Sequence, residues 1–189
     1  IIDMDQDLLG KILIASPGLE DLRFQNTVIL ICEHTSEVIM GLILNKPIHN
    51  FNTKDLLKQL KIESNAISKV QSTFYGGPVH LNQGFIIHSD EIKYSNSESI
   101  LNNVIITTSN QVLIDISKGT PPLDTKVFLG CAVWDNNQLD NEMLENSWII
   151  SNGTKDLIFH QNSELSLWNK CLLDIGIDPN RLVSYSGNA

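Results

Sequence analysis

Three apolar segments follow one another within residues 8–44, and their spacing constrains the fold more than any other feature of the chain. They read LLGKILIA at 8–15, TVILIC at 27–32 and VIMGLIL at 38–44. The second is almost wholly apolar and rich in β-branched residues, which predicts a strand buried on both faces. Only five residues separate the second segment from the third, too few for a parallel crossover. The sequence therefore predicts three strands, the last two of which form an antiparallel hairpin.

Strands and helices alternate irregularly along the rest of the chain. Apolar runs predict strands at 84–88, 104–108, 126–134 and 148–150, and helical spacing predicts helices at about 53–60, 109–117, 137–146 and 163–175. Residues 89–99, rich in Ser, Asn and Glu, are predicted to form a surface loop. A regular strand–helix–strand period is missing, so we expect an α+β fold around a mixed, mainly antiparallel sheet.

The length of 189 residues predicts one domain that spans residues 1–189. The formal net charge is −9, and Arg23 and Arg181 are the only arginines. Because phosphate backbones are bound through clustered Lys and Arg, direct nucleic-acid binding is not expected.

Two features of the sequence bear on location. No run of apolar residues approaches the roughly 18 needed to span a membrane. The first residues carry Asp3, Asp5 and Asp7, whereas a signal peptide starts with basic residues. We therefore expect a cytoplasmic protein with no membrane partner.

The three cysteines, Cys32, Cys131 and Cys171, are widely spaced and form no CxxC pair. Neither a disulfide framework nor a zinc ribbon is indicated. Cys32 and Cys131 lie in apolar strands, where burial raises the pKa of a thiol. Both are predicted to be structural, Cys131 in preference to a role as a nucleophile.

The histidines offer the most direct acid–base chemistry. His34 ends the second apolar segment and could act as a general base oriented by Glu33 or Glu37, or could simply bond the local backbone. His80 and His88 flank a predicted strand, but no third ligand accompanies them, so no metal site is predicted. No glycine turn has dinucleotide or Walker spacing, and no cofactor is predicted.

A polar stripe follows the strand at 126–134. Gln138, Glu142 and Asn146 recur every four residues after Trp134 and would share one side of the predicted helix. They could line a pocket beside the tryptophan, or form a solvated helix face. Both interpretations stay open at this stage.

Several longer blocks carry a family resemblance, among them IASPGLEDLRFQNTVILICEH, MGLILNKP, FYGGPVHLNQGFIIH and VFLGCAVWDNNQLDNEMLENSWI. Together they resemble the bacterial YqgE/AlgH family over essentially the whole chain. The positions that the family motif marks here are Pro17, Gly18, Asp21, Phe24, His34, Asn45, Gly76, Gly77, Pro78, His88, Gly130, Trp134, Gln138 and Glu142.

The resemblance implies a compact α+β domain whose bent or bifurcated sheet curls into a pseudo-barrel with flanking helices. It implies no established activity, cofactor or catalytic set, although the family has been labelled as a transcriptional regulator. The charge of −9 makes direct DNA binding a poor explanation of that label.

The first functional hypothesis is a non-catalytic binding or regulatory protein with an unknown protein or small-molecule partner. It predicts a groove or an exposed apolar patch near Trp134 or near Phe74 and Tyr75. The predicted binding residues are Asp21, Asn45, Trp134 and Gln138, although Asp21 and Asn45 could equally fasten turns.

The alternative hypothesis is a hydrolase-type enzyme of unrecognised class. It would use His34 or His88 with Glu142 or Asp21, so His34, His88 and Glu142 are its catalytic candidates. These groups would have to converge in one concave site.

Overall fold

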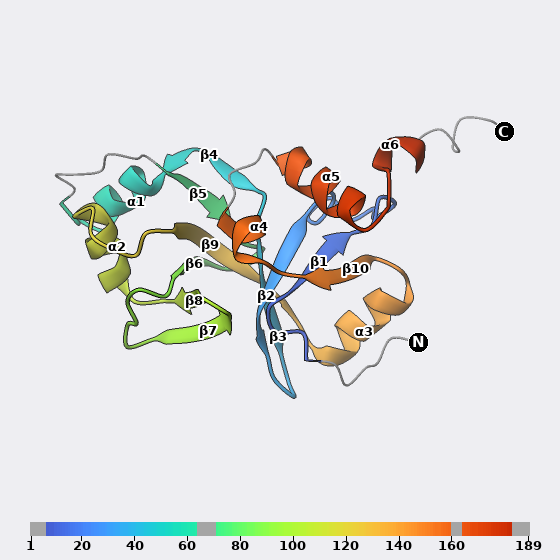
Figure 1. Cartoon of the computed structure of the whole chain (residues 1–189), viewed down its shortest axis with the longest axis horizontal. Coiled ribbons are helices and arrows are strands. Elements are labelled where there is room, and N and C mark those ends of the chain that lie inside the picture. The colour runs from blue at the N-terminus through green and yellow to red at the C-terminus, as the bar shows by residue number, and fades with distance from the viewer. Residues whose placement is uncertain (1–6, 64–70, 160–163, 183–189) are drawn as a thin grey trace.

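A curled sheet organises the protein, and helices cover it (Figure 1). The computed structural model describes residues 7–63, 71–159 and 164–182. Its strands are β1 (Lys11–Ala15), β2 (Val28–His34), β3 (Ile39–Ile43), β4 (Pro47–Asn52), β5 (Ser72–Tyr75), β6 (Val79–Ser89), β7 (Ser97–Leu101), β8 (Val104–Thr107), β9 (Thr125–Trp134) and β10 (Trp148–Asn152). Its helices are α1 (Thr53–Gln59), α2 (Asn110–Ser117), α3 (Asn136–Leu144), α4 (Lys155–Phe159), α5 (Glu164–Asp174) and α6 (Pro179–Leu182).

The order of the strands confirms the predicted α+β fold. Eight strands lie in the order β10-β1-β2-β3-β9-β6-β8-β7, and β4 and β5 branch from this path. Neighbouring strands pair antiparallel except β5 and β9, which are parallel. The β2–β3 hairpin is present as predicted. Val28 to Ile31 are fully buried, as expected for a strand covered on both faces.

The sheet divides along one edge of β9, which confirms a bent and bifurcated sheet. Residues Val127 to Leu129 pair with β5, and Ala132 to Trp134 pair with β3. Between them Gly130 has a φ of 74°, a conformation that favours glycine. A Cβ added at Gly130 would overlap the carbonyl oxygen of Gly77, so two segments of backbone cross here without room for side chains.

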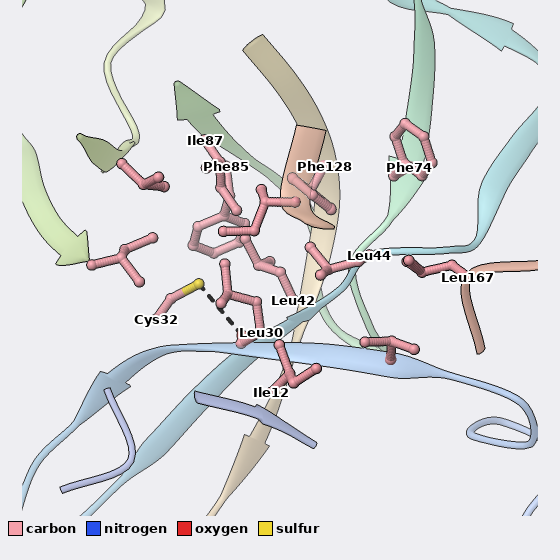
Figure 2. Close-up of a cluster of buried hydrophobic side chains, with 14 of the residues drawn as sticks. Ile12, Leu30, Cys32, Leu42, Leu44, Phe74, Phe85, Ile87, Phe128 and Leu167 are labelled. Atoms are coloured by element: carbon pink, nitrogen blue, oxygen red, sulfur yellow. Dashed lines mark hydrogen bonds between the residues drawn. The ribbon is translucent and has the colours of Figure 1, made fainter. Parts of the chain in front are cut away.

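The inner face of the curled sheet holds the largest hydrophobic cluster (Figure 2). Side chains alternate across a strand, so Ile12 and Leu30 point into this cluster while their neighbours point away. Helix α5 closes the cluster with four buried residues, Leu167, Trp168, Cys171 and Leu172. The Trp168 indole fixes the helix to the sheet, because its Nε1 donates to the Ala15 carbonyl at 2.8 Å.

The opposite face of the sheet is covered by other helices. Leu139 and Met143 of α3 pack against the alternate residues of β1, β2 and β3. Figure 1 accordingly shows α3 and α5 on opposite sides of β1 and β10. Helices α1 and α2 cover β6 and β9 at the far end of the sheet. Within the described ranges, no helix is long and apolar enough to cross a membrane.

The structure differs from the sequence prediction most at β6 and β7. The strand predicted at 84–88 extends from Val79 to Ser89. The prediction of a surface loop at 89–99 is wrong at its C-terminal end, because β7 begins at Ser97. Ser97, Glu98 and Ser99 are polar and so show none of the apolar alternation that identifies a strand. The first residues of this missed strand line a groove.

Candidate functional site

A groove of about 750 Å³ opens between the end of the β2–β3 hairpin and strand β7, and we call it the β2–β7 groove. Small-molecule sites in proteins usually enclose about 300–1,000 Å³, so this groove has the size of a binding site. Its lining residues are Leu9, Cys32, Glu33, His34, Thr35, Val38, Met40, His80, Gln83, Phe85, Ser95, Asn96, Ser97, Glu98, Ser99, Ile106, Thr108, Cys131 and Val133.

The two thiols of the groove are structural in character. Cys32 and Cys131 are buried, and desolvation raises the pKa of Cys32 far above its ordinary value and that of Cys131 to about 11. A nucleophilic cysteine needs the opposite shift. The prediction that both cysteines are buried is confirmed, and the Cys32 thiol donates to the Leu30 carbonyl at 3.5 Å.

His34 is the only predicted catalytic candidate that lines the groove. Its Nδ1 accepts a hydrogen bond from the Leu8 backbone N–H at 3.0 Å and lies 3.4 Å from an Asp7 carboxylate oxygen. Because Nδ1 is an acceptor here, the imidazole proton lies on Nε2. The carboxylate beside His34 is that of Asp7, rather than the predicted Glu33 or Glu37, and its Oδ1 accepts from the Leu9 N–H at 3.0 Å.

Glu142 and two tryptophans form a second polar cluster, which we call the indole clamp (Trp134, Glu142 and Trp148). One carboxylate oxygen, Oε2, accepts from Trp134 Nε1 at 3.0 Å and from Trp148 Nε1 at 2.7 Å. The other, Oε1, accepts from Gln138 Nε2 at 3.0 Å. Because both indoles are buried, Glu142 supplies their hydrogen-bond acceptor. Two residues of the predicted polar stripe, Gln138 and Glu142, therefore take part in packing the tryptophans.

Phe24 and Asp21 extend the clamp toward the loop that follows β1. The Phe24 ring packs 6.3 Å from the Trp134 ring and 5.7 Å from the Trp148 ring. The Arg23 guanidinium lies 5.4 Å from the Phe24 ring centroid and donates to Asp21 at 2.7 Å. This bond lowers the pKa of Asp21. Asp21 thus fastens the loop over the aromatic cluster.

Asn45 also fastens the chain. Its side chain is almost fully buried, accepts from Val28 N at 2.9 Å and donates to the Asn26 carbonyl at 2.8 Å. These bonds tie the end of β3 to the start of β2. The turn-fastening interpretation of Asn45 therefore has direct geometric support.

His88 lies in the core and belongs neither to the lining of the β2–β7 groove nor to the indole clamp. Its Nδ1 is 2.8 Å from the Ser89 carbonyl oxygen and its Nε2 is 2.7 Å from Thr107 Oγ1. A carbonyl only accepts, so Nδ1 carries the proton and Thr107 donates to Nε2. Thr107 Oγ1 is in turn 2.8 Å from Ser97 Oγ. Burial lowers the pKa of His88, which keeps the ring neutral, and the chain of bonds anchors the start of β7.

The structure divides the predicted site residues instead of bringing them together. His34 and Val133 both line the groove. Trp134, the residue after Val133, belongs to the hydrophobic cluster on the opposite face of the sheet. His88 pairs with Thr125, at the other end of β9 from Trp134, and these ends are about 30 Å apart in an extended strand. Trp134, Gln138 and Glu142 do lie together.

A groove or an exposed apolar patch was predicted near Trp134 or near Phe74 and Tyr75. Trp134 and Phe74 are buried, and Tyr75 is partly buried. The groove lies instead on the opposite face of the same end of β9, at Cys131 and Val133. Sequence reasoning also missed Glu98 and its neighbours on β7, which become visible only once the sheet curls. Within the described ranges, no group of three His, Cys, Asp or Glu side chains could hold a metal ion.

Known proteins of similar sequence match this chain over nearly its whole length. The AlgH-like family model (DUF179) matches residues 12–180. A UPF0301 protein of Pectobacterium carotovorum is 38% identical over 187 residues, which cover 97% of this chain and 100% of that protein. A UPF0301 protein of Paracoccus denitrificans is 36% identical over 191 residues and is covered completely, as is this chain.

Two solved structures share the fold. The solution structure of the AlgH protein from Pseudomonas aeruginosa matches with a TM-score of 0.76 at 29% identity, covering 98% of this chain and 97% of that one. A crystal structure from Corynebacterium diphtheriae matches with a TM-score of 0.73 at 18% identity, which bears on the fold alone.

Proposed function

The chain belongs to the bacterial AlgH-like family, and we propose that it is a non-catalytic binding or regulatory protein whose ligand occupies the β2–β7 groove. The proposal places it in the cytoplasm as a single-domain protein, with a small molecule or a protein segment as its partner. Its net charge of −9 and its two arginines argue against nucleic acid as that partner.

The groove itself is the observation that carries the proposal. It combines a volume suited to a ligand with an apolar floor and a polar rim, the usual composition of a binding site. Met40, Phe85 and Val133 contribute apolar surface, while His34 and Glu98 offer polar contacts. Burial raises the pKa of both thiols of the groove, so neither supplies a nucleophile.

The hydrolase alternative receives less support from the geometry. It requires His34 or His88 to act with Glu142 or Asp21. Glu142 bonds two indoles on the other face of the sheet, Asp21 bonds Arg23, and His88 is fully buried in the core. His34 thus lies in the groove without either predicted carboxylate partner.

A thermal-shift screen tests the proposal. The full chain is screened against a metabolite collection and against pools of random octapeptides. A ligand present at 100 times its Kd stabilises the folded state by about 2.7 kcal/mol, which corresponds to a rise in Tm of about 5–10 °C for a chain of this size. We expect at least one such ligand.

Two tryptophan variants locate the binding. Ser99→Trp fills the groove from its exposed rim and should abolish the shift. Leu123→Trp is the matched control, because Leu123 is 77% exposed and lies outside the groove lining. A ligand that shifts both variants as strongly as the original chain would place binding elsewhere and refute the proposal. So would the absence of any stabilising ligand.

A further inference from the structure

The curled sheet comes close to closing on itself, because β7, the last strand in the order, lies beside the residue that precedes β1. We call this line of approach the seam, and the groove lies beside it. A Cβ built on Gly10 would lie 3.0 Å from the Ile100 carbonyl oxygen, so this end of the seam is closely packed. Ile100 belongs to the inner hydrophobic cluster. The seam is therefore closed at the C-terminal end of β7 and opens into the groove at the N-terminal end.

Strand β7 meets the groove with its edge. Ser97, Glu98 and Ser99, the first three residues of β7, all line the groove, as do Ser95 and Asn96 of the preceding turn. Side chains alternate between the two faces of a strand, so a groove against a face would be lined by every second residue. Consecutive lining residues indicate that the backbone edge itself borders the groove. Among the described strands β7 pairs with β8 alone, which leaves this edge without a strand partner.

An unpaired strand edge carries a row of backbone donors and acceptors that can pair with another extended chain. The groove offers space beside that edge, with Leu9 and residues 32–35 on the opposite side. The three residues of β7 that line the groove span roughly 10 Å, enough to pair with about three residues of an added strand. The site thus offers an extended chain both space and backbone partners.

The charged residues that line the groove indicate which kind of peptide would bind there. Its lining residues, all from the described part of the protein, include Glu33 and Glu98 but no lysine or arginine. The floor is apolar at Met40, Phe85 and Val133. A strand laid in the groove would turn alternate side chains to this floor and the others toward the glutamates. The complementary chain has apolar residues at every second position and a lysine or arginine between them.

We propose that the β2–β7 groove binds an extended peptide segment of a partner protein, which adds to the free edge of β7 and carries alternating apolar residues with at least one basic residue. This proposal rests on the proposed function and specifies its ligand. The anchoring of Ser97 through Thr107 to His88 holds the edge in place before a peptide arrives, which reduces the ordering cost of binding.

A displayed library of random octapeptides, selected on the full chain, tests the proposal. Enriched sequences should alternate apolar and polar residues and carry lysine or arginine. A synthetic peptide from the selection is then methylated at one backbone nitrogen at a time. Because only every second amide of an added strand faces β7, methylation should weaken binding about tenfold or more at alternate positions and have little effect between them.

Variants of the protein complete the test. Glu98→Lys should weaken binding of the basic peptide, and Ser99→Trp should abolish it. Glu20→Lys is the matched control, because Glu20 is exposed and does not line the groove. Methylation effects without a two-residue period, or enrichment of acidic peptides, would overturn the proposal.

The outcome also separates this proposal from the proposed function. If no peptide is enriched while a metabolite stabilises the chain and loses its effect in Ser99→Trp, the groove is a small-molecule site and the peptide proposal fails alone. If neither kind of ligand binds, both proposals fail.

Discussion

Lys126 is a buried lysine, and its burial affects how the free energy of unfolding depends on pH. It is 6% exposed, and its Nζ donates to the carbonyl oxygens of Leu44 at 2.7 Å and Ile158 at 3.2 Å. Nζ also lies 4.2 Å from the centroid of the Phe74 ring. These contacts favour the ammonium, but desolvation is the larger effect and lowers the pKa of Lys126 from 10.5 to about 7.

Through this shift Lys126 contributes stability that rises with pH, whereas the buried thiols, whose pKa values are raised, contribute stability that falls with pH. Between pH 7 and 10.5 the unfolded chain binds more protons at Lys126 than the folded chain does, so stability is gained as pH rises and lost as it falls. With folded and unfolded pKa values of about 7 and 10.5, the gain between pH 7 and about pH 9.5 is about 3 kcal/mol. Below pH 7 the contribution levels off.

Urea unfolding followed by tryptophan fluorescence, at several pH values and with a reductant present, measures this gain. Lys126→Met removes the titrating group, so the change in its free energy of unfolding from pH 7 to about pH 9.5 should be about 3 kcal/mol less positive than that of the original chain. Lys118→Met is the control, because Lys118 is exposed at the end of α2, and it should retain the slope of the original chain. Parallel curves for the original chain and Lys126→Met would refute the reasoning.

Three further predictions concern the indole clamp, the glycine crossing and the buried histidine. Glu142→Ala leaves two buried indole N–H groups without their acceptor and should cost about 2–5 kcal/mol in urea unfolding, whereas Glu142→Gln, which keeps a carbonyl oxygen, should cost clearly less. Equal losses would contradict the clamp. Gly130→Ala should cost about 2–5 kcal/mol through overlap with Gly77 and a positive φ, while Gly18→Ala, whose Cβ meets nothing within 4 Å, should be nearly neutral by the same measurement. Because burial lowers the pKa of His88 below 6.5, unfolding free energy should fall as pH drops below 6.5, and His88→Gln should remove this dependence; an unchanged slope would contradict the assignment.

The sequence predicted those parts of the fold that local patterns determine. Apolar runs identified β2 and β3, and the five residues between them required a hairpin. β7 was missed because its first residues are polar where they border the groove. Lys126 was missed as a buried charge because a lysine at the start of an apolar strand resembles an ordinary solvated end.

The candidate site was only partly predictable for a related reason. Trp134, Gln138 and Glu142 are neighbours along one strand and helix, so their spacing anticipated a cluster, although not its bond to Trp148. The groove joins Glu33 to Glu98, and only the curl of the whole sheet brings these distant segments together. Side-chain alternation also separates Trp134 from Val133, which a linear motif cannot show.

Hydrogen exchange with a bound ligand tests most directly whether the β2–β7 groove is the binding site. Amide exchange is measured along the full chain, with and without a ligand from the screen at about 100 times its Kd. We predict slower exchange concentrated at residues 32–35 and 95–99, the two sides of the groove. Protection confined instead to α3 and the loop around Phe24, beside the indole clamp, would contradict the account.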